Sequence, residues 1–243
     1  MSAPAASRAA TPTVLCRGLL FDLDGVLVNS TPAVERVWRA WAVEHGFDPG
    51  EVAGRALGRP SLETLRHYLP HANHQLENEV FVRREAADLD GVEAMPGAAA
   101  LLQALPPEAW AVVTSCTRPL AEARWGAAGL PRPRHWVTSD MIAHGKPAPD
   151  GYLRGAEVLG LTPADCVVLE DAPVGIAAGK AAGARVLAVT TTTPAAALWA
   201  AGADWLAPSV AALRLEHTTP TLTFTLESAL PPPPKSQKLT ANS

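Results

Sequence analysis

Two carboxylates at the end of an apolar run are the first residues of this chain whose types and spacing could do chemistry. The run begins at Leu19, and Asp22 and Asp24 end it just before Gly25. A short apolar run that ends at a glycine predicts a buried strand of a parallel sheet. Ligands bind at the carboxyl ends of such strands, so both aspartates should lie near a substrate. Two like charges so close together require a cation or a shared proton, unless they only end the strand.

Three further predicted strands end in polar residues at the same topological position. They are Trp110–Val113, followed by Thr114 and Ser115, His135–Val137, followed by Lys146, and Cys166–Leu169, followed by Glu170 and Asp171. Carboxylate oxygens are hard ligands that suit Mg²⁺. Hydroxyls and amides can bind phosphate oxygens, and a lysine offsets the negative charge that accumulates there. Each residue alone has an ordinary reading as a turn or loop residue, but together they predict a phosphoryl-transfer site.

The elements that must position these residues are of two kinds. A helix is expected to begin at Ser30, with its hydroxyl as the N-cap, and only helical patterns follow as far as Leu89. From Pro96 onward strands and helices alternate, which predicts an α/β fold: a Rossmann-like parallel sheet with helices on both faces. The alternating segment Thr221–Leu226 is expected to add an edge strand. The expected divisions are a flexible N-terminus over 1–13, an α/β core over 14–28 and 96–215, an inserted helical domain over 29–95, and a Pro-rich, partly disordered tail over 216–243.

Composition excludes several classes of function. The 243 residues are 48% apolar and 18% charged, as in globular proteins, and a net charge of −4 offers no basic surface for nucleic acid. No apolar run has the length of a membrane span, and residues 1–12 show no signal-peptide pattern. Three scattered cysteines favour a reducing compartment over a disulfide framework. We therefore expect a cytoplasmic monomer with no nucleic-acid or membrane partner.

The four polar strand ends also resemble a known family. The segments Asp22–Val28, Val113–Ser115, Gly145–Pro147 and Val168–Pro173 are similar, in this order, to the four motifs of the haloacid dehalogenase-like hydrolases. The resemblance covers roughly residues 14–215, and the helical insertion resembles the helical cap domain of that family. Within the family, the residues of these segments are most similar to those of bacterial sugar and hexitol phosphatases.

This resemblance implies a Mg²⁺-dependent phosphoric monoester hydrolase that acts on small phosphorylated sugars or sugar alcohols. Asp22 would attack phosphorus and form an aspartyl-phosphate. Asp24 would protonate the leaving oxygen and then deprotonate the attacking water. A β-phosphoglucomutase-like phosphomutase and a catalytically silent binding module are the alternatives. The implied metal ligands are Asp22, the backbone carbonyl of Asp24, Glu170 and Asp171, and the implied phosphate-binding residues are Thr114, Ser115 and Lys146.

Three smaller features of the sequence could each have a functional role or an ordinary structural one. Arg59, in a Gly- and Pro-bounded break of the insertion, could reach substrate, or it could lie in a solvated turn. Cys116 is not a thiol-phosphatase nucleophile, because such enzymes use Cys-x5-Arg and Glu122 stands at the arginine position. A small buried loop residue is the better interpretation. Trp38 and Trp41 have helical spacing typical of packing, although they could also cover a sugar ring.

Overall fold

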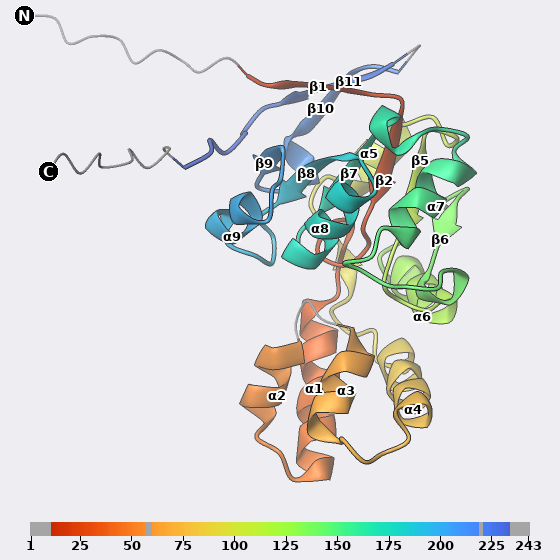
Figure 1. Cartoon of the computed structure of the whole chain (residues 1–243), viewed down its shortest axis with the longest axis vertical. Coiled ribbons are helices and arrows are strands. Elements are labelled where there is room, and N and C mark those ends of the chain that lie inside the picture. The colour runs from red at the N-terminus through yellow and green to blue at the C-terminus, as the bar shows by residue number, and fades with distance from the viewer. Residues whose placement is uncertain (1–10, 57–59, 219–220, 234–243) are drawn as a thin grey trace, which may run out of the picture.

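A parallel sheet of six strands forms the centre of the larger domain (Figure 1). The computed structural model describes residues 11–56, 60–218 and 221–233. The strand order is β6-β5-β2-β7-β8-β9, and each neighbouring pair is parallel. The chain winds from β2 to one edge and then, from β7, to the other, so the order reverses beside β2. The strands are β2 (Gly18–Phe21), β5 (Trp110–Val113), β6 (Trp136–Val137), β7 (Cys166–Glu170), β8 (Arg185–Val189) and β9 (Trp205–Ala207).

Helices cover both faces of this sheet, which confirms the predicted α/β architecture. Alternate residues of β2 face opposite sides: Leu19 and Phe21 lie in one core with α5 and α6, and Leu20 lies in the other with α7, α8 and α9. The continuous apolar run of β2 is thus explained by burial on both faces. The helices are α5 (Ala98–Ala104), α6 (Arg118–Ala127), α7 (Asp150–Val158), α8 (Pro173–Ala181) and α9 (Ala195–Ala200), with three short 3₁₀ turns at Ser139–Met141, Pro163–Asp165 and Val210–Ala212.

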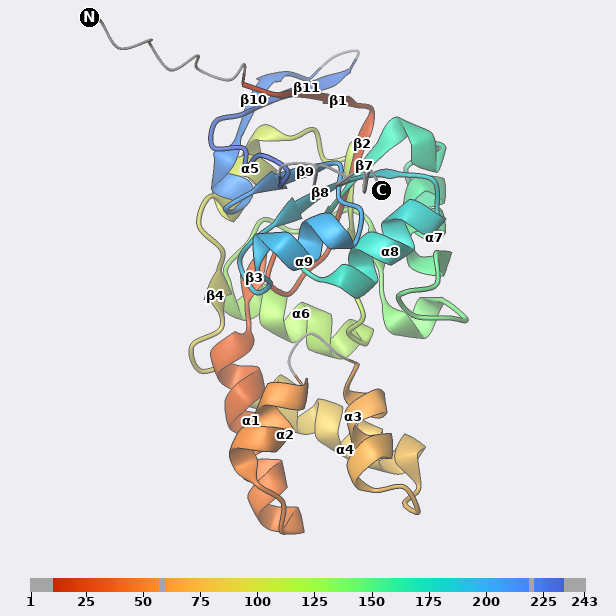
Figure 2. The ribbon, with the colours of Figure 1, turned by 60° about the vertical axis from the view of Figure 1, so that its left-hand side comes forward.

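Four helices between β3 and β4 form a second, smaller unit (Figures 1 and 2). The two short strands pair antiparallel and connect this unit to the sheet domain. Its own core contains Trp38, Trp41 and Phe81, each buried, so the two tryptophans pack inside it instead of covering a ligand. The elements are β3 (Val28–Asn29), α1 (Thr31–His45), α2 (Pro49–Ala56), α3 (Ser61–Tyr68), α4 (His74–Ala87) and β4 (Glu93–Ala94).

A separate antiparallel sheet lies beyond the parallel one (Figure 2). It consists of β1 (Thr13–Cys16), β10 (Leu213–His217) and β11 (Leu222–Leu226) in the order β1-β11-β10. The strand expected over Thr221–Leu226 exists, but its expected edge position is wrong, because β11 lies between two partners. The alternation found in the sequence places buried Leu222, Phe224 and Leu226 against the core.

No helix in the part of the chain that the structure describes is long and apolar enough to cross a membrane.

Candidate active site

The carboxyl ends of β2 and β7, and the loop that carries Lys146, meet at a single point. Nζ of Lys146 lies 2.6 Å from Oδ1 of Asp22 and 2.6 Å from Oε1 of Glu170. The same ammonium is 3.4 Å from the backbone oxygen of Val113, at the end of β5. Three strand ends named from the sequence therefore converge on one lysine. They do so because β5, β2 and β7 are parallel neighbours beside the reversal of strand order, where ligand sites form in such sheets.

Both carboxylate oxygens of Glu170 accept hydrogen bonds from neighbouring donors. Its Oε1 accepts from Lys146 and, at 2.6 Å, from the hydroxyl of Tyr152. Its Oε2 accepts from the backbone N–H groups of Asp171 at 3.1 Å and Ala172 at 3.3 Å. With four donors on two oxygens, this carboxylate fixes the position of Lys146 and the turn after β7.

Asp171 is held from two sides. The hydroxyl of Thr192 donates to its Oδ2. Gly25, at φ 79°, lies so close that a Cβ at this position would be 2.0 Å from Oδ2 of Asp171. The hydroxyl of Thr191 donates to the backbone oxygen of Gly25 at 2.6 Å and ties the loop after β8 to the turn after β2. The turn therefore requires glycine, because a side chain would displace the carboxylate.

Asp22, Glu170 and Asp171 form a compact, buried carboxylate cluster. One oxygen from each lies within 4.8 Å of the others. Burial raises the pKa of Asp22 well above its ordinary value, and repulsion from Glu170 and Asp171 adds to this against the opposing effect of Lys146. Burial and Glu170 raise the pKa of Asp171 to about 7. Three carboxylates thus share one lysine, and the cluster lacks positive charge. Hard oxygen donors with this charge deficit fit a divalent cation such as Mg²⁺.

Lys146 is protonated in this setting. Burial by itself would lower the pKa of its ammonium, but Asp22 and Glu170 outweigh burial and raise that pKa well above its ordinary value. A buried, protonated ammonium beside Asp22 can stabilise the negative charge of a phosphoryl group.

Asp24 points to a different set of partners. Its Oδ1 accepts a hydrogen bond of 2.6 Å from the hydroxyl of Ser30. Its Oδ2 accepts from Arg124 at 2.9 Å and from the thiol of Cys116 at 3.2 Å. The predicted capping role of Ser30 is wrong: Ser30 is the N-cap residue of α1, but its side chain makes no capping bond, because its hydroxyl is used by Asp24. Any contribution of Asp24 to a metal site would come from its backbone carbonyl, as the resemblance implies.

The residues predicted to bind phosphate or substrate, other than Lys146, are Thr114, Ser115 and Arg59. Thr114 is buried, and its hydroxyl oxygen accepts a hydrogen bond of 3.1 Å from the backbone of Cys116, which shapes the loop after β5. Ser115 is exposed in the same loop. Both roles in phosphate binding remain predictions. Arg59 lies outside the described residues.

Several residues of this site were missed from the sequence. Thr191 and Thr192 follow β8, so the strand-end criterion, applied to one more strand, could have found them. No local pattern points to Tyr152 and Arg124, whose partners lie 18 and 100 residues away in the chain.

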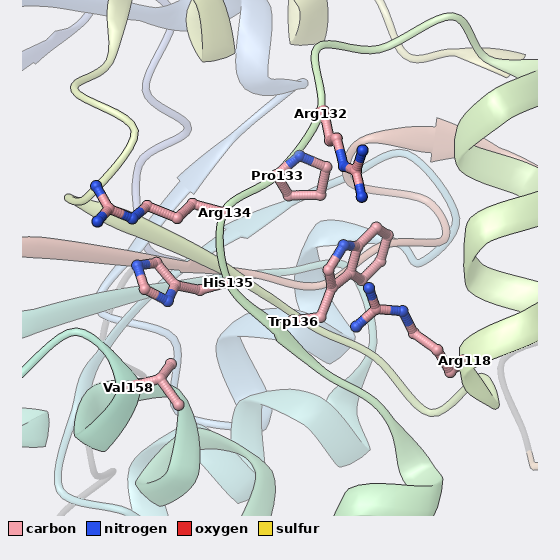
Figure 3. A pocket seen from close by; sticks show the side chains of 7 residues that line it. All are labelled: Arg118, Arg132, Pro133, Arg134, His135, Trp136 and Val158. Atoms are coloured by element: carbon pink, nitrogen blue, oxygen red, sulfur yellow. The ribbon is translucent and has the colours of Figure 1, made fainter.

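A surface cavity of about 550 Å³ lies elsewhere (Figure 3). Arg118 and Arg132 extend toward Trp136, with the guanidinium of Arg118 5.1 Å from the ring centre, and Arg134 extends to the other side of the backbone. Arg132 and Arg134 are exposed. None of the residues that line this cavity is a catalytic candidate, so its size alone gives it no part in the site. The lining residues are Arg118, Arg132, Pro133, Arg134, His135, Trp136 and Val158.

Comparison with known proteins identifies the family of this chain. The family model for haloacid dehalogenase-like hydrolases matches residues 16–183, which contain all four strand ends of the site. The chain belongs to this family. The resemblance found in the sequence is thereby confirmed, and the four-helix unit between β3 and β4 is consistent with the cap domain of these hydrolases.

Two relatives and one solved structure illustrate the similarity of this hydrolase to known members. Hexitol phosphatase A of Escherichia coli (strain K12) is 48% identical over 179 residues, covering 72% of this chain and 83% of that protein. 2-Deoxyglucose-6-phosphate phosphatase 2 of Saccharomyces cerevisiae is 34% identical over 209 residues, covering 77% and 85%. The crystal structure of a HAD family hydrolase from Deinococcus radiodurans R1, with bound phosphate and sodium, has a TM-score of 0.61 and 33% identity, covering 79% of this chain and 90% of that one.

Proposed function

We propose that this hydrolase is a Mg²⁺-dependent phosphatase of small phosphorylated sugars or sugar alcohols, and that it works through an aspartyl-phosphate on Asp22. The observation that carries the proposal is the contact of Lys146 with Asp22, 2.6 Å long, inside a buried carboxylate cluster. The relatives named above are phosphatases of hexitols and of a sugar phosphate by name, which agrees with the expected class of phosphoric monoester hydrolase.

In the first half-reaction, a carboxylate oxygen of Asp22 attacks phosphorus, and the bond to the sugar oxygen breaks. Asp24 gives its proton to the departing oxygen, which leaves as an alcohol. In the second, Asp24 takes a proton from water, the water oxygen attacks the phosphoryl group, and the carboxylate of Asp22 is released with inorganic phosphate. Lys146 holds Asp22 in place and offsets the negative charge on the phosphoryl oxygens throughout.

The metal would be held by Asp22, Asp171 and the backbone carbonyl of Asp24. When bound, Mg²⁺ supplies the positive charge that the carboxylate cluster lacks and keeps Asp22 ionised beside a dianionic substrate. Glu170 already accepts four hydrogen bonds, and its part is support through Lys146 and the turn after β7.

The residues between the two short strands complete the proposal. We assign 29–95 as a cap whose closure over the sheet domain excludes bulk water and selects the leaving group. Arg59 is the residue of this cap that we propose for contact with substrate hydroxyls.

A substrate screen tests the proposal. Purified protein with Mg²⁺ is offered hexose, hexitol, pentose and glycerol phosphates, and both inorganic phosphate and isomerised sugar phosphate are measured. We expect stoichiometric phosphate release, with none from the Asp22→Asn variant prepared in parallel, which excludes a contaminating phosphatase. Isomerised product without phosphate would instead favour the phosphomutase. No turnover of any ester would contradict the proposal.

A further inference from the structure

A buried arginine connects the four-helix cap with the sheet domain. Arg124 lies on α6, and its side chain is only 6% exposed. One terminal nitrogen donates to Oδ2 of Asp24 at 2.9 Å, and the other donates to Oε1 of Glu85, on α4 of the cap, also at 2.9 Å. The two helices pack against each other where the cap meets the sheet domain (Figure 2). A single guanidinium therefore joins the predicted acid/base residue to a cap helix.

A second contact of Asp24 also leads to the cap, whereas its hydrogen bond from the thiol of Cys116 stays within the sheet domain. Ser30, which donates to Oδ1, is the N-cap residue of α1. One oxygen of Asp24 is thus tied to the start of the first cap helix, and the other is tied through Arg124 to the last. Glu85 is itself buried, so its carboxylate and Arg124 compensate each other inside the interface. A movement of α4 that carries Glu85 must move or release Arg124, because a desolvated charge cannot be left unpaired without a large cost.

The chemistry of arginine suits this connection. Its planar guanidinium presents several donors in a fixed fork, and the two carboxylates occupy separate nitrogens. A lysine carries its charge on a single nitrogen, so it could not keep the two carboxylates on separate nitrogens as Arg124 does. A purely structural ion pair would need only Glu85 and Arg124. Here the pair ends on the residue that transfers protons in the proposed reaction.

We propose that Arg124 is a positioning residue that sets the carboxylate of Asp24 according to the position of the cap, through Glu85. This rests on the proposed phosphatase activity and adds a link between cap closure and protonation of the leaving group. Attack by Asp22 does not depend on the link, because the contacts of Asp22 with Lys146 involve neither Arg124 nor Glu85.

The consequence is a specific dependence on the leaving group. An ester whose leaving group is stable as an anion needs little help from an acid, whereas a more basic leaving group needs the proton. Loss of positioning should therefore slow cleavage of basic leaving groups and spare acidic ones. The quantity to compare is kcat/KM, because the later hydrolysis of the aspartyl-phosphate, in which Asp24 acts as a base for every substrate, affects kcat alone.

The test uses Arg124→Lys and Glu85→Gln, with p-nitrophenyl phosphate and phenyl phosphate as substrates of nearly equal size. Asp88→Asn is the matched control, since Asp88 ends α4 and pairs with Arg36 at the cap surface without contact to Asp24. In Arg124→Lys we expect kcat/KM for phenyl phosphate to fall about 10- to 100-fold, part of the range for general acid catalysis, and that for p-nitrophenyl phosphate to fall less than about threefold. Glu85→Gln should show the same pattern with a smaller fall, and Asp88→Asn should match the wild type.

The outcomes separate this proposal from the proposed function. A wild-type protein that releases phosphate from no sugar or sugar-alcohol ester refutes the function. With that function present, the positioning role requires that the wild type cleave both aryl esters. The positioning role is overturned if the wild type does not cleave both aryl esters. It is also overturned if the variants lower kcat/KM for both esters by equal factors, as general damage to the fold would. If Arg124→Lys does not fold, the isosteric Glu85→Gln decides by the same comparison.

Discussion

Nζ of Lys146 lies 2.6 Å from Oδ1 of Asp22, although 124 residues separate them in the chain. The same nitrogen lies 2.6 Å from Oε1 of Glu170, so a single buried cation serves two carboxylates. Asp171 adds a third carboxylate to the cluster. The stability of the site and the reactivity of Asp22 thus both depend on Lys146, and both can be tested by substitution.

Replacing Lys146 by glutamine should destabilise the protein and abolish turnover. The change leaves buried carboxylates without their cation, which typically costs about 3–5 kcal/mol of the free energy of unfolding. Urea denaturation measures this. Lys180→Gln is the control, because Lys180 makes an exposed ion pair with Asp204 and should lose less than about 1 kcal/mol. Equal losses in the two variants would show that Lys146 does not compensate a buried charge.

Asp22→Asn should remove turnover and leave the protein folded. The substitution keeps the shape of the side chain but replaces the nucleophilic carboxylate by a neutral amide, and it relieves repulsion within the carboxylate cluster. Phosphate release and the thermal unfolding midpoint are measured on the same sample. Activity close to that of the wild type would exclude Asp22 as the nucleophile.

Gly175→Ala should disturb the active site from within α8. A Cβ at this position would lie 1.7 Å from Oε1 of Glu170, so the carboxylate that holds Lys146 must move. We expect a fall in kcat of more than about tenfold together with lower stability, since a displaced buried carboxylate loses its hydrogen bonds. Gly54→Ala, in α2, is the matched control: nothing lies within 4 Å of its Cβ. That variant should be as stable as the wild type or up to about 1 kcal/mol more stable. A Gly175→Ala protein that behaves like the control would contradict the site geometry.

Binding of Mg²⁺ should depend on pH through Asp171. Its pKa is about 7 in the metal-free fold, against roughly 3.9 in an unfolded chain. Between these values the folded state binds more protons, so the metal-free protein loses stability as pH rises, and the loss is complete above about pH 7. A carboxylate must be ionised to bind a cation. The increase in the unfolding temperature on adding Mg²⁺ should therefore be larger at pH 8 than at pH 6.

Asp171→Asn provides the control for this pH dependence. The amide does not titrate, so the part of the pH dependence that comes from position 171 should disappear, and the shift caused by Mg²⁺ should be small. A wild-type shift that is the same at pH 6 and pH 8 would show that Asp171 is not a ligand.

The sequence predicted the sheet and the residues at its edge because both depend on local patterns. Apolar runs such as Leu19–Phe21 predict strands that are buried on both faces. The polar residue at the end of such a strand is the next residue in the sequence. Parallel strands then bring Asp22 and Glu170 together, and Lys146 reaches both from the loop between β6 and α7.

The environment of Asp24 could not be predicted in this way. Arg124 is one polar residue on an amphipathic helix, and nothing local distinguishes it from an exposed arginine. Its partner Glu85 likewise looks like a surface residue of α4 until two helices pack. Ser30 shows a local rule overridden by tertiary contact, because its hydroxyl bonds to Asp24 instead of capping α1.

The antiparallel pairing of β1 with β11 has a consequence for how the protein assembles. Thr13 pairs with Thr225, so β1 must wait for β11, which is synthesised much later, before its backbone groups are satisfied. Such distant pairings close slowly, and an unpaired strand is open to other chains in the meantime. During synthesis, the catalytic sheet can form while β1 is still exposed, and the arrival of β11 then shields that strand from its neighbours in the cell.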